Sequence, residues 1–202
     1  MNFGRAIALA LAVAWCAVNT KPVAAAGEDP DWPCVQRLVP EIAAGMIWSG
    51  PPLDGVEGEP APMIDQMASE LAARRVPLAE AEAQVEAFAS TLDREHEGKQ
   101  LTRLFARTLE IINRDRTSII QGIKKYARGE RALAQAIADK NARLAALPAD
   151  QIAEREAITA ERDWDLRVYD DRRSALSYLC EQPVLLEQRA FALARSIAAH
   201  LE

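Results

Sequence analysis

The residues best suited to chemistry in this chain are its three cysteines and two histidines. Cys34 and Cys180 lie 146 positions apart, and the chain has no Cys-x-x-Cys for thiol exchange and no Cys-x-x-Cys-His for haem attachment. Cys16 falls in an N-terminal segment that we expect to be removed. The sequence therefore predicts a disulfide between Cys34 and Cys180, worth about 4 to 5 kcal/mol in the chain-entropy treatment.

A metal site is the next chemistry to consider. Asp93 and His96 have the i, i+3 spacing with which a carboxylate and an imidazole share a metal on one helix face. Such sites need a second copy of the motif, and Ile197 stands at that spacing from the other histidine, His200. His96 also lies in a charged run, which is typical of a solvated helix end. We therefore predict neither a metal nor a cofactor.

Catalytic motifs of other kinds are missing from the sequence. It has no Gly-x-Ser-x-Gly elbow and no glycine-rich loop after a strand. Pairs of carboxylates are common in a chain with 30 acidic residues, so a hydrolase that acts on cell-wall glycan stays an alternative. The aromatic content of 5% offers few rings for stacking on sugars. We expect a protein without catalytic activity.

The candidate partner-binding residues are Trp32, Trp48 and the run Arg114, Asp115 and Arg116. Tryptophan and arginine often dominate protein interfaces. The alternative for the tryptophans is that they form a lid over the core, which we favour because aromatic residues are scarce here. The charged run has the alternative of a solvated helix face. Asp115 falls on an apolar stripe, so we expect it to be buried, as a partner-binding residue or in a polar layer that sets the helix register.

The first 26 residues have the layout of a secretory signal peptide. One arginine precedes thirteen apolar residues at positions 6–18, and small residues at 24–26 provide a cleavage site. The apolar run is short for a membrane anchor, which takes about 20 residues. Cleavage after Ala26 leaves 22 basic and 30 acidic residues, a net charge of -8. This charge argues against nucleic-acid binding, and no membrane-inserted segment is expected after cleavage.

The remaining chain divides into two zones. Residues 27–61 hold six prolines and two tryptophans, so we predict an extended segment with one short helical turn near positions 41–47. Residues 62–202 are rich in Ala, Glu, Leu and Arg with a period of 3.6, which indicates an all-α bundle. Its first two helices are expected at positions 63–71 and from 78 to near Gly98.

The rest of the bundle domain is predicted to be a long antiparallel helical hairpin of residues 99–147 and 149–201. Apolar residues recur at steps of three and four through both helices of the hairpin, and Pro148 supplies the turn. We expect Gly122 or Gly129 to bend the first of these helices, and Pro183 to kink or restart the second. The inward stripe of the second helix is predicted to include Ala153, Ala157, Ala160 and Trp164.

A turn centred on Pro148 also predicts the register of the hairpin. Residues equally far before and after the turn should face each other. This rule pairs Lys140 with Glu156, Arg131 with Asp165, and Lys125 with Asp171. It also places Asp115 opposite Glu181, beside Cys180.

These features favour an exported protein, periplasmic or secreted, that acts as an adaptor or chaperone-like assembly factor for another envelope protein. A small-ligand or metal-binding bundle is the alternative, and a homodimer through the long stripes stays open. In outline the chain is similar to periplasmic helical-hairpin chaperones. Leu101 and Thr102 begin the Leu-Thr-x-x-Gln signature of one such group, but Phe105 stands where glutamine is needed, so we assign no family.

Overall fold

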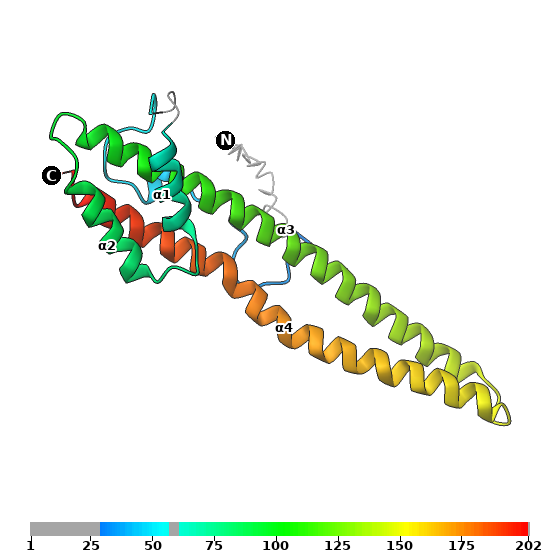
Figure 1. Cartoon of the computed structure of the whole chain (residues 1–202). Coiled ribbons are helices and arrows are strands. Elements are labelled where there is room, and N and C mark those ends of the chain that lie inside the picture. The colour runs from blue at the N-terminus through cyan, green and yellow to red at the C-terminus, as the bar shows by residue number, and fades with distance from the viewer. Residues whose placement is uncertain (1–28, 57–60, 202) are drawn as a thin grey trace, which may run out of the picture.

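The computed structural model describes residues 29–56 and 61–201. Within these residues the chain forms four α-helices, one 3-10 helix and no strand (Figure 1). The helices are α1 (Pro62–Ala72), α2 (Leu78–Ala89), α3 (Glu97–Ala146) and α4 (Ile152–Ala198), and the 3-10 helix is Ala44–Met46. The all-α prediction is therefore confirmed. The predicted signal peptide, including Cys16 and the cleavage site after Ala26, lies outside the described residues.

Helices α3 and α4 form the predicted hairpin. They have 50 and 47 residues, so α3 alone is about 75 Å long. The chain reverses between them at the position of Pro148, at one end of the molecule (Figure 1). None of the described helices is both long enough and apolar enough to span a membrane.

The hydrophobic core lies at the end of the hairpin opposite the turn. There α1 and α2 pack beside the first part of α3 and the last part of α4 (Figure 1). Apolar residues from all four helices and from the N-terminal segment of residues 29–56 meet in one cluster. Its fully buried members include Leu71, Val85, Leu101, Leu104, Ile112, Leu193 and Ile197. We call this end the bundle, and residues 117–146 and 152–179 the arm.

Two helix boundaries differ from the predictions. Helix α2 ends at Ala89, well before Gly98, and turns at residues 90–96 lead into α3. Helix α4 runs unbroken through Pro183, so the predicted restart is wrong. A proline inside a helix removes one backbone hydrogen bond. Pro183 is buried, and the helix continues on both sides of it despite this loss.

The predicted register is close at the backbone, but its charge pairs are wrong. The Tyr126 hydroxyl donates to the Arg172 carbonyl at 3.1 Å, two residues from the partner that the rule gives. Lys140 pairs with Asp165 at 2.8 Å instead of Glu156. The hydrogen bond from Asp165 is the main reason that the pKa of Lys140 is raised. Long flexible side chains reach along the neighbouring helix, so facing positions alone do not determine the pairs.

Candidate functional site

The N-terminal segment is fastened across the hairpin by the predicted disulfide. Cys34 and Cys180 are bonded, and their Cα atoms lie 5.6 Å apart, within the normal range for a disulfide. Cys180 is buried at the boundary between the bundle and the arm. The bond therefore ties an extended segment to the middle of α4, as predicted.

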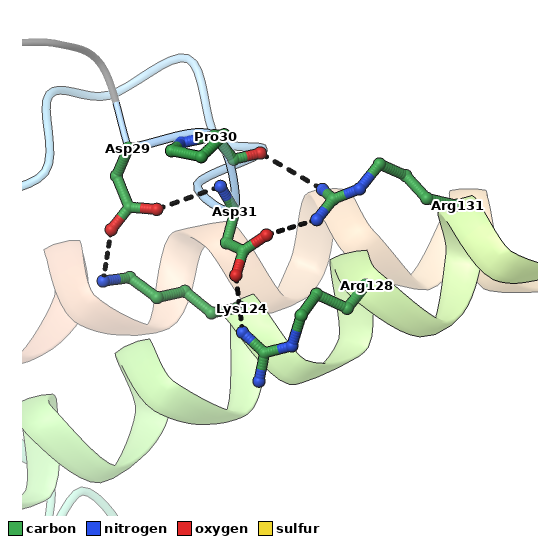
Figure 2. A network of polar contacts seen from close by, with 6 residues as sticks. All are labelled: Asp29, Pro30, Asp31, Lys124, Arg128 and Arg131. Atoms are coloured by element: carbon green, nitrogen blue, oxygen red, sulfur yellow. Dashed lines mark hydrogen bonds and ion pairs between the residues drawn. The ribbon is translucent and has the colours of Figure 1, made fainter.

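Acidic residues next to the disulfide clamp the same segment onto α3. Asp29 accepts a contact from Lys124 at 2.7 Å, and Asp31 accepts one from Arg128 at 2.7 Å and another from Arg131 (Figure 2). Hydrogen bonds from Lys124 and Arg128, respectively, are the main reason that the pKa values of Asp29 and Asp31 are lowered. The predicted register had paired Arg131 with Asp165 on α4. Arg131 instead contacts Asp31 of the N-terminal segment.

Farther along the N-terminal segment, the side-chain amide of Asn113 on α3 holds the backbone of Ile42. No pattern in the sequence predicted this contact. The Asn113 Oδ1 accepts from the Ile42 backbone N–H at 2.9 Å, and its Nδ2 donates to the Ile42 carbonyl at 3.0 Å. Ile42 is buried in the core cluster. One amide thus satisfies both backbone polar groups of a buried residue that belongs to no regular element.

Trp48 forms a lid over the core. Its ring stacks on Phe105, with centroids 4.1 Å apart and planes 4° apart, and its Nε1 donates to the Pro51 carbonyl at 2.8 Å. A Cβ at Gly50 would collide with the Trp48 ring, so only glycine lets the chain fold back there. Trp48 packs against the core cluster. These contacts give it the structural role that the sequence favoured over partner binding.

The charged run on α3 is oriented differently from the prediction. The Asp115 side chain is 50% exposed and lies 3.6 Å from Arg114, so the predicted burial of Asp115 is wrong. Arg116 is the buried member, at 3% exposure. From Ile112 the apolar period can continue by three residues or by four. Contact with α4 selects the step of four, which turns Arg116 inward.

Arg116 serves the joint between the two long helices. Its Nε donates to the Pro183 carbonyl at 3.2 Å, and its Nη2 lies 3.7 Å from Glu187. Burial lowers the pKa of Arg116, and Glu187 partly offsets this effect. Trp32 and Arg116 line one small cavity of about 30 Å³ beside Cys180. The structure therefore brings these two candidates together, while Trp48 lies elsewhere and Arg114 and Asp115 face outward.

A second buried arginine, Arg189, holds the link between α1 and α2. Its Nε donates to the Leu71 carbonyl, and its Nη1 donates to the Val76 carbonyl at 2.8 Å. Burial lowers the pKa of Arg189. The burial of Arg189 has no signal in the sequence, because an arginine in a charged helix normally faces water.

The candidate metal ligands of the sequence contact each other on the surface. The Asp93 and His96 side chains meet at 2.7 Å on the surface. No group of three His, Cys, Asp or Glu side chains suited to a metal occurs among the described residues. An open cleft of about 490 Å³ lies between the N-terminal segment and α3. In this cleft Arg107 pairs with Asp65 at 2.9 Å and with Glu110 at 2.5 Å, and Asn113 holds Ile42.

The largest departure from the predicted core is the exposed face of α4 in the arm. Trp164 is 62% exposed and Tyr178 is 65% exposed, so the prediction that Trp164 faces inward is wrong. Ile158, which is buried, lies about 120° around the helix from Trp164. Asp165 and Arg172 also point toward α3: Asp165 accepts from Lys140, and the Arg172 guanidinium lies 5.9 Å from the Tyr126 ring centroid.

No covering element reaches this face within the described residues, because α1 and α2 pack only at the bundle end (Figure 1). The Arg167 guanidinium lies 5.5 Å from the Trp164 ring centroid, a cation–π contact that shields part of the ring. Tryptophan and tyrosine are the residue types that most often anchor protein interfaces. This face is the candidate binding site.

Comparison with known proteins adds no further information: no protein-family model, curated protein or solved structure matches the chain. The assignment of function therefore depends on the residues and the geometry of the arm and the bundle.

Proposed function

We propose that this chain is an exported, non-catalytic helical protein that acts as an adaptor or chaperone-like assembly factor of the cell envelope. Its arm is the surface on which it binds a protein. The observation that carries this proposal is the exposure of Trp164 and Tyr178 on one helix that projects away from the core. Interfaces derive most of their binding free energy from such aromatic anchors.

The division of the molecule supports a binding role. Polar side chains of the bundle hold the chain together: Asn113 fastens Ile42, Arg189 fastens the α1–α2 link, and Arg116 joins α3 to α4. The bundle and the clamped N-terminal segment then act as a rigid base for the arm. A rigid base lowers the entropy cost of presenting a binding surface.

An exported location is part of the same proposal. The layout of residues 1–26 is that of a signal peptide, and a disulfide is compatible with an oxidising compartment, periplasmic or extracellular.

Site-specific photocrosslinking in cells tests the proposal. A photoreactive amino acid is placed at position 164 or 178, and the matched control carries it at Asp139, which is exposed on α3 of the same arm. We expect discrete protein adducts from 164 and 178 in the envelope fraction, identified by mass spectrometry, and none from 139. Absence of any adduct at 164 and 178 would refute the assignment of the arm as the binding surface.

A further inference from the structure

The exposed face of α4 has a regular pattern of large and small residues. Every seventh position from 157 to 185 forms one row, and every seventh position from 153 to 181 forms the neighbouring row. All ten positions are exposed. The first row is Ala157, Trp164, Asp171, Tyr178 and Leu185, and the second row is Ala153, Ala160, Arg167, Ser174 and Glu181. Together the rows form the a and d positions of a heptad repeat, and we call them the outer stripe.

The outer stripe is separate from the face that packs on α3. The α3-facing side of α4 in this region is formed by Ile158, Asp165 and Arg172. The part of α4 in the arm therefore has two separate faces. One face packs on α3, and the other, the outer stripe, is exposed to solvent. A heptad seam of about 48 Å, from position 153 to 185, is long enough for a second helix to pack along it.

We propose that the occupant of the outer stripe is a second copy of this chain, paired antiparallel about a two-fold axis at the level of residue 169. This inference rests on the proposed function, since it names the protein that the arm binds. In such a pair each residue faces the residue equally far on the other side of position 169, and every a position faces a d position of the partner.

Complementarity of size supports the antiparallel pair. Tyr178 falls opposite Ala160, Leu185 opposite Ala153, and Trp164 opposite Ser174. Each large side chain thus meets a small one, which lets two helices approach closely without voids. Glu181 meets Ala157, where its aliphatic stem covers the small residue while its carboxylate stays at the rim.

Complementarity of charge points to the same arrangement. Arg167 of one copy falls opposite Asp171 of the other, and the symmetry forms this pair twice at the centre of the interface. A parallel in-register pair would instead place Asp171 against Asp171, Trp164 against Trp164, and small residues against small ones. Like charges and uneven gaps disfavour that alternative.

The antiparallel dimer also has a consequence for function. The two bundles would lie at opposite ends of a shared rod, because Leu185 at the base of one arm meets Ala153 near the tip of the other. Each end would then carry one disulfide-fastened N-terminal segment. An adaptor built in this way can hold two identical partners at a fixed separation.

The first test is a charge-reversal series on the mature, oxidised chain, followed by light scattering and sedimentation. We expect the wild type to be a dimer, and Arg167→Asp or Asp171→Arg alone to weaken it tenfold or more, because two like-charge pairs form at the centre. The double variant R167D/D171R should restore the dimer. Circular dichroism of each variant controls for helix loss. A monomeric wild type, or a double variant no better than the singles, would overturn the proposal.

The second test reports the orientation. Positions 160 and 178 are about 27 Å apart along one helix, so cysteines placed there cannot join within a chain. In the antiparallel dimer A160C/Y178C should form two interchain disulfides, whereas A160C or Y178C alone should form none. A covalent dimer from either single variant would contradict the antiparallel pairing, as would a double variant that stays unlinked.

These results separate the two proposals. If the wild type is monomeric while a crosslinker at 164 captures a different envelope protein, the self-pairing is wrong and the binding function of the arm stands. If the wild type is monomeric and no adduct forms at 164, both proposals fail. If the dimer forms as described and crosslinking at 164 yields the chain itself, both stand.

Discussion

The bundle and the arm are built from the same two helices, yet they bury their side chains very differently. In the bundle α3 and α4 are surrounded by α1, α2 and the N-terminal segment, so residues on several faces are enclosed. In the arm α3 and α4 pack on each other, and the N-terminal segment adds surface contacts to α3 at Lys124, Arg128 and Arg131. The buried residues there form a single narrow seam, namely Ile120, Ile123, Ala127, Ile137, Leu144 and Ile158.

This difference separates the part of the molecule that stabilises the fold from the part that we propose to bind a protein. Burial of apolar surface is the main source of folding free energy, and most of it lies in the bundle. The arm contributes less burial and leaves aromatic side chains in solvent. The disulfide lies at the boundary and fastens the N-terminal segment to α4, and the Asp29 and Asp31 contacts fasten the same segment to α3 within the arm.

A pair of leucine truncations tests most directly whether the bundle is packed more tightly than the arm. Leu101 lies at 0% exposure in the bundle, and Leu144 lies at 8% near the tip of the arm. We expect Leu101→Ala to cost about 3 to 4 kcal/mol and Leu144→Ala about 2 kcal/mol or less, because the thin arm can close around a small void. Urea unfolding of both variants gives the two values. Equal losses would mean that the arm is packed as well as the bundle.

Removal of the disulfide is expected to have the next largest effect. Replacement of Cys34 and Cys180 with serine should lower the free energy of unfolding by about 2 to 4 kcal/mol, since the bond closes most of the chain into a loop. Urea unfolding measures the loss, and limited proteolysis should locate new cleavage in residues 29–56. As a control, thiol labelling of the wild type should require reduction. An unchanged unfolding midpoint would contradict the role of the bond.

The two tryptophans form a matched comparison of core and surface. Trp48→Ala removes a ring stacked on Phe105 and should cost about 2 to 3 kcal/mol, below the usual range for a fully buried ring because Trp48 is half-buried. Trp164→Ala should change stability by less than about 0.5 kcal/mol. Thermal or urea unfolding measures both. If Trp48→Ala were silent and Trp164→Ala destabilising, the assignments of lid and binding face would be reversed.

The smallest expected effect is the pH dependence of the clamp. Contacts from Lys124 and Arg128 lower the pKa of Asp29 and Asp31 in the folded chain. Because these pKa values are lowered, the stabilisation from the contacts is fully present above the ordinary carboxyl pKa. It is lost as the pH falls through the lower pKa that each carboxyl has in the folded chain. Hydrogen exchange of residues 29–39 should therefore speed up, relative to the arm, as the pH falls below about 4.

Asp31→Asn is the control for that measurement. It removes the charge at all pH values, so residues 29–39 should exchange faster at neutral pH and show a weaker response to acid. Added salt should have a similar effect on the wild type, because these side chains are accessible to ions. Exchange that is as slow in the variant as in the wild type would show that the disulfide alone holds the segment.

Much of the architecture could be predicted from local patterns. The period of 3.6 located both long helices, Pro148 marked the reversal between them, and the proline-rich stretch predicted an extended segment. The cysteine count predicted the disulfide, because only two cysteines lie outside the predicted signal peptide. These features depend on residue types within a few positions or on simple counting, so no knowledge of the packing was needed.

The candidate binding residues were harder to predict. Asp115 and Arg116 are adjacent, and both fit an apolar period that continues from Ile112 by three or by four residues. In α4 the stripe with Ala153, Ala160 and Trp164 looked like a core seam as much as the stripe with Ile158 did. Asn113 and Arg189 gave no signal at all, because their partners are backbone groups more than seventy positions away in sequence.

The sequence by itself determined that the chain is helical, where it turns and which cysteines are joined, since backbone propensity, proline and thiol pairing act without reference to neighbours. Only the tertiary structure decided which side of each long helix faces its partner. An alanine-rich helix has several faces that could be buried, and the choice depends on where the other helix crosses it. That choice enclosed Arg116 and left Trp164 in solvent.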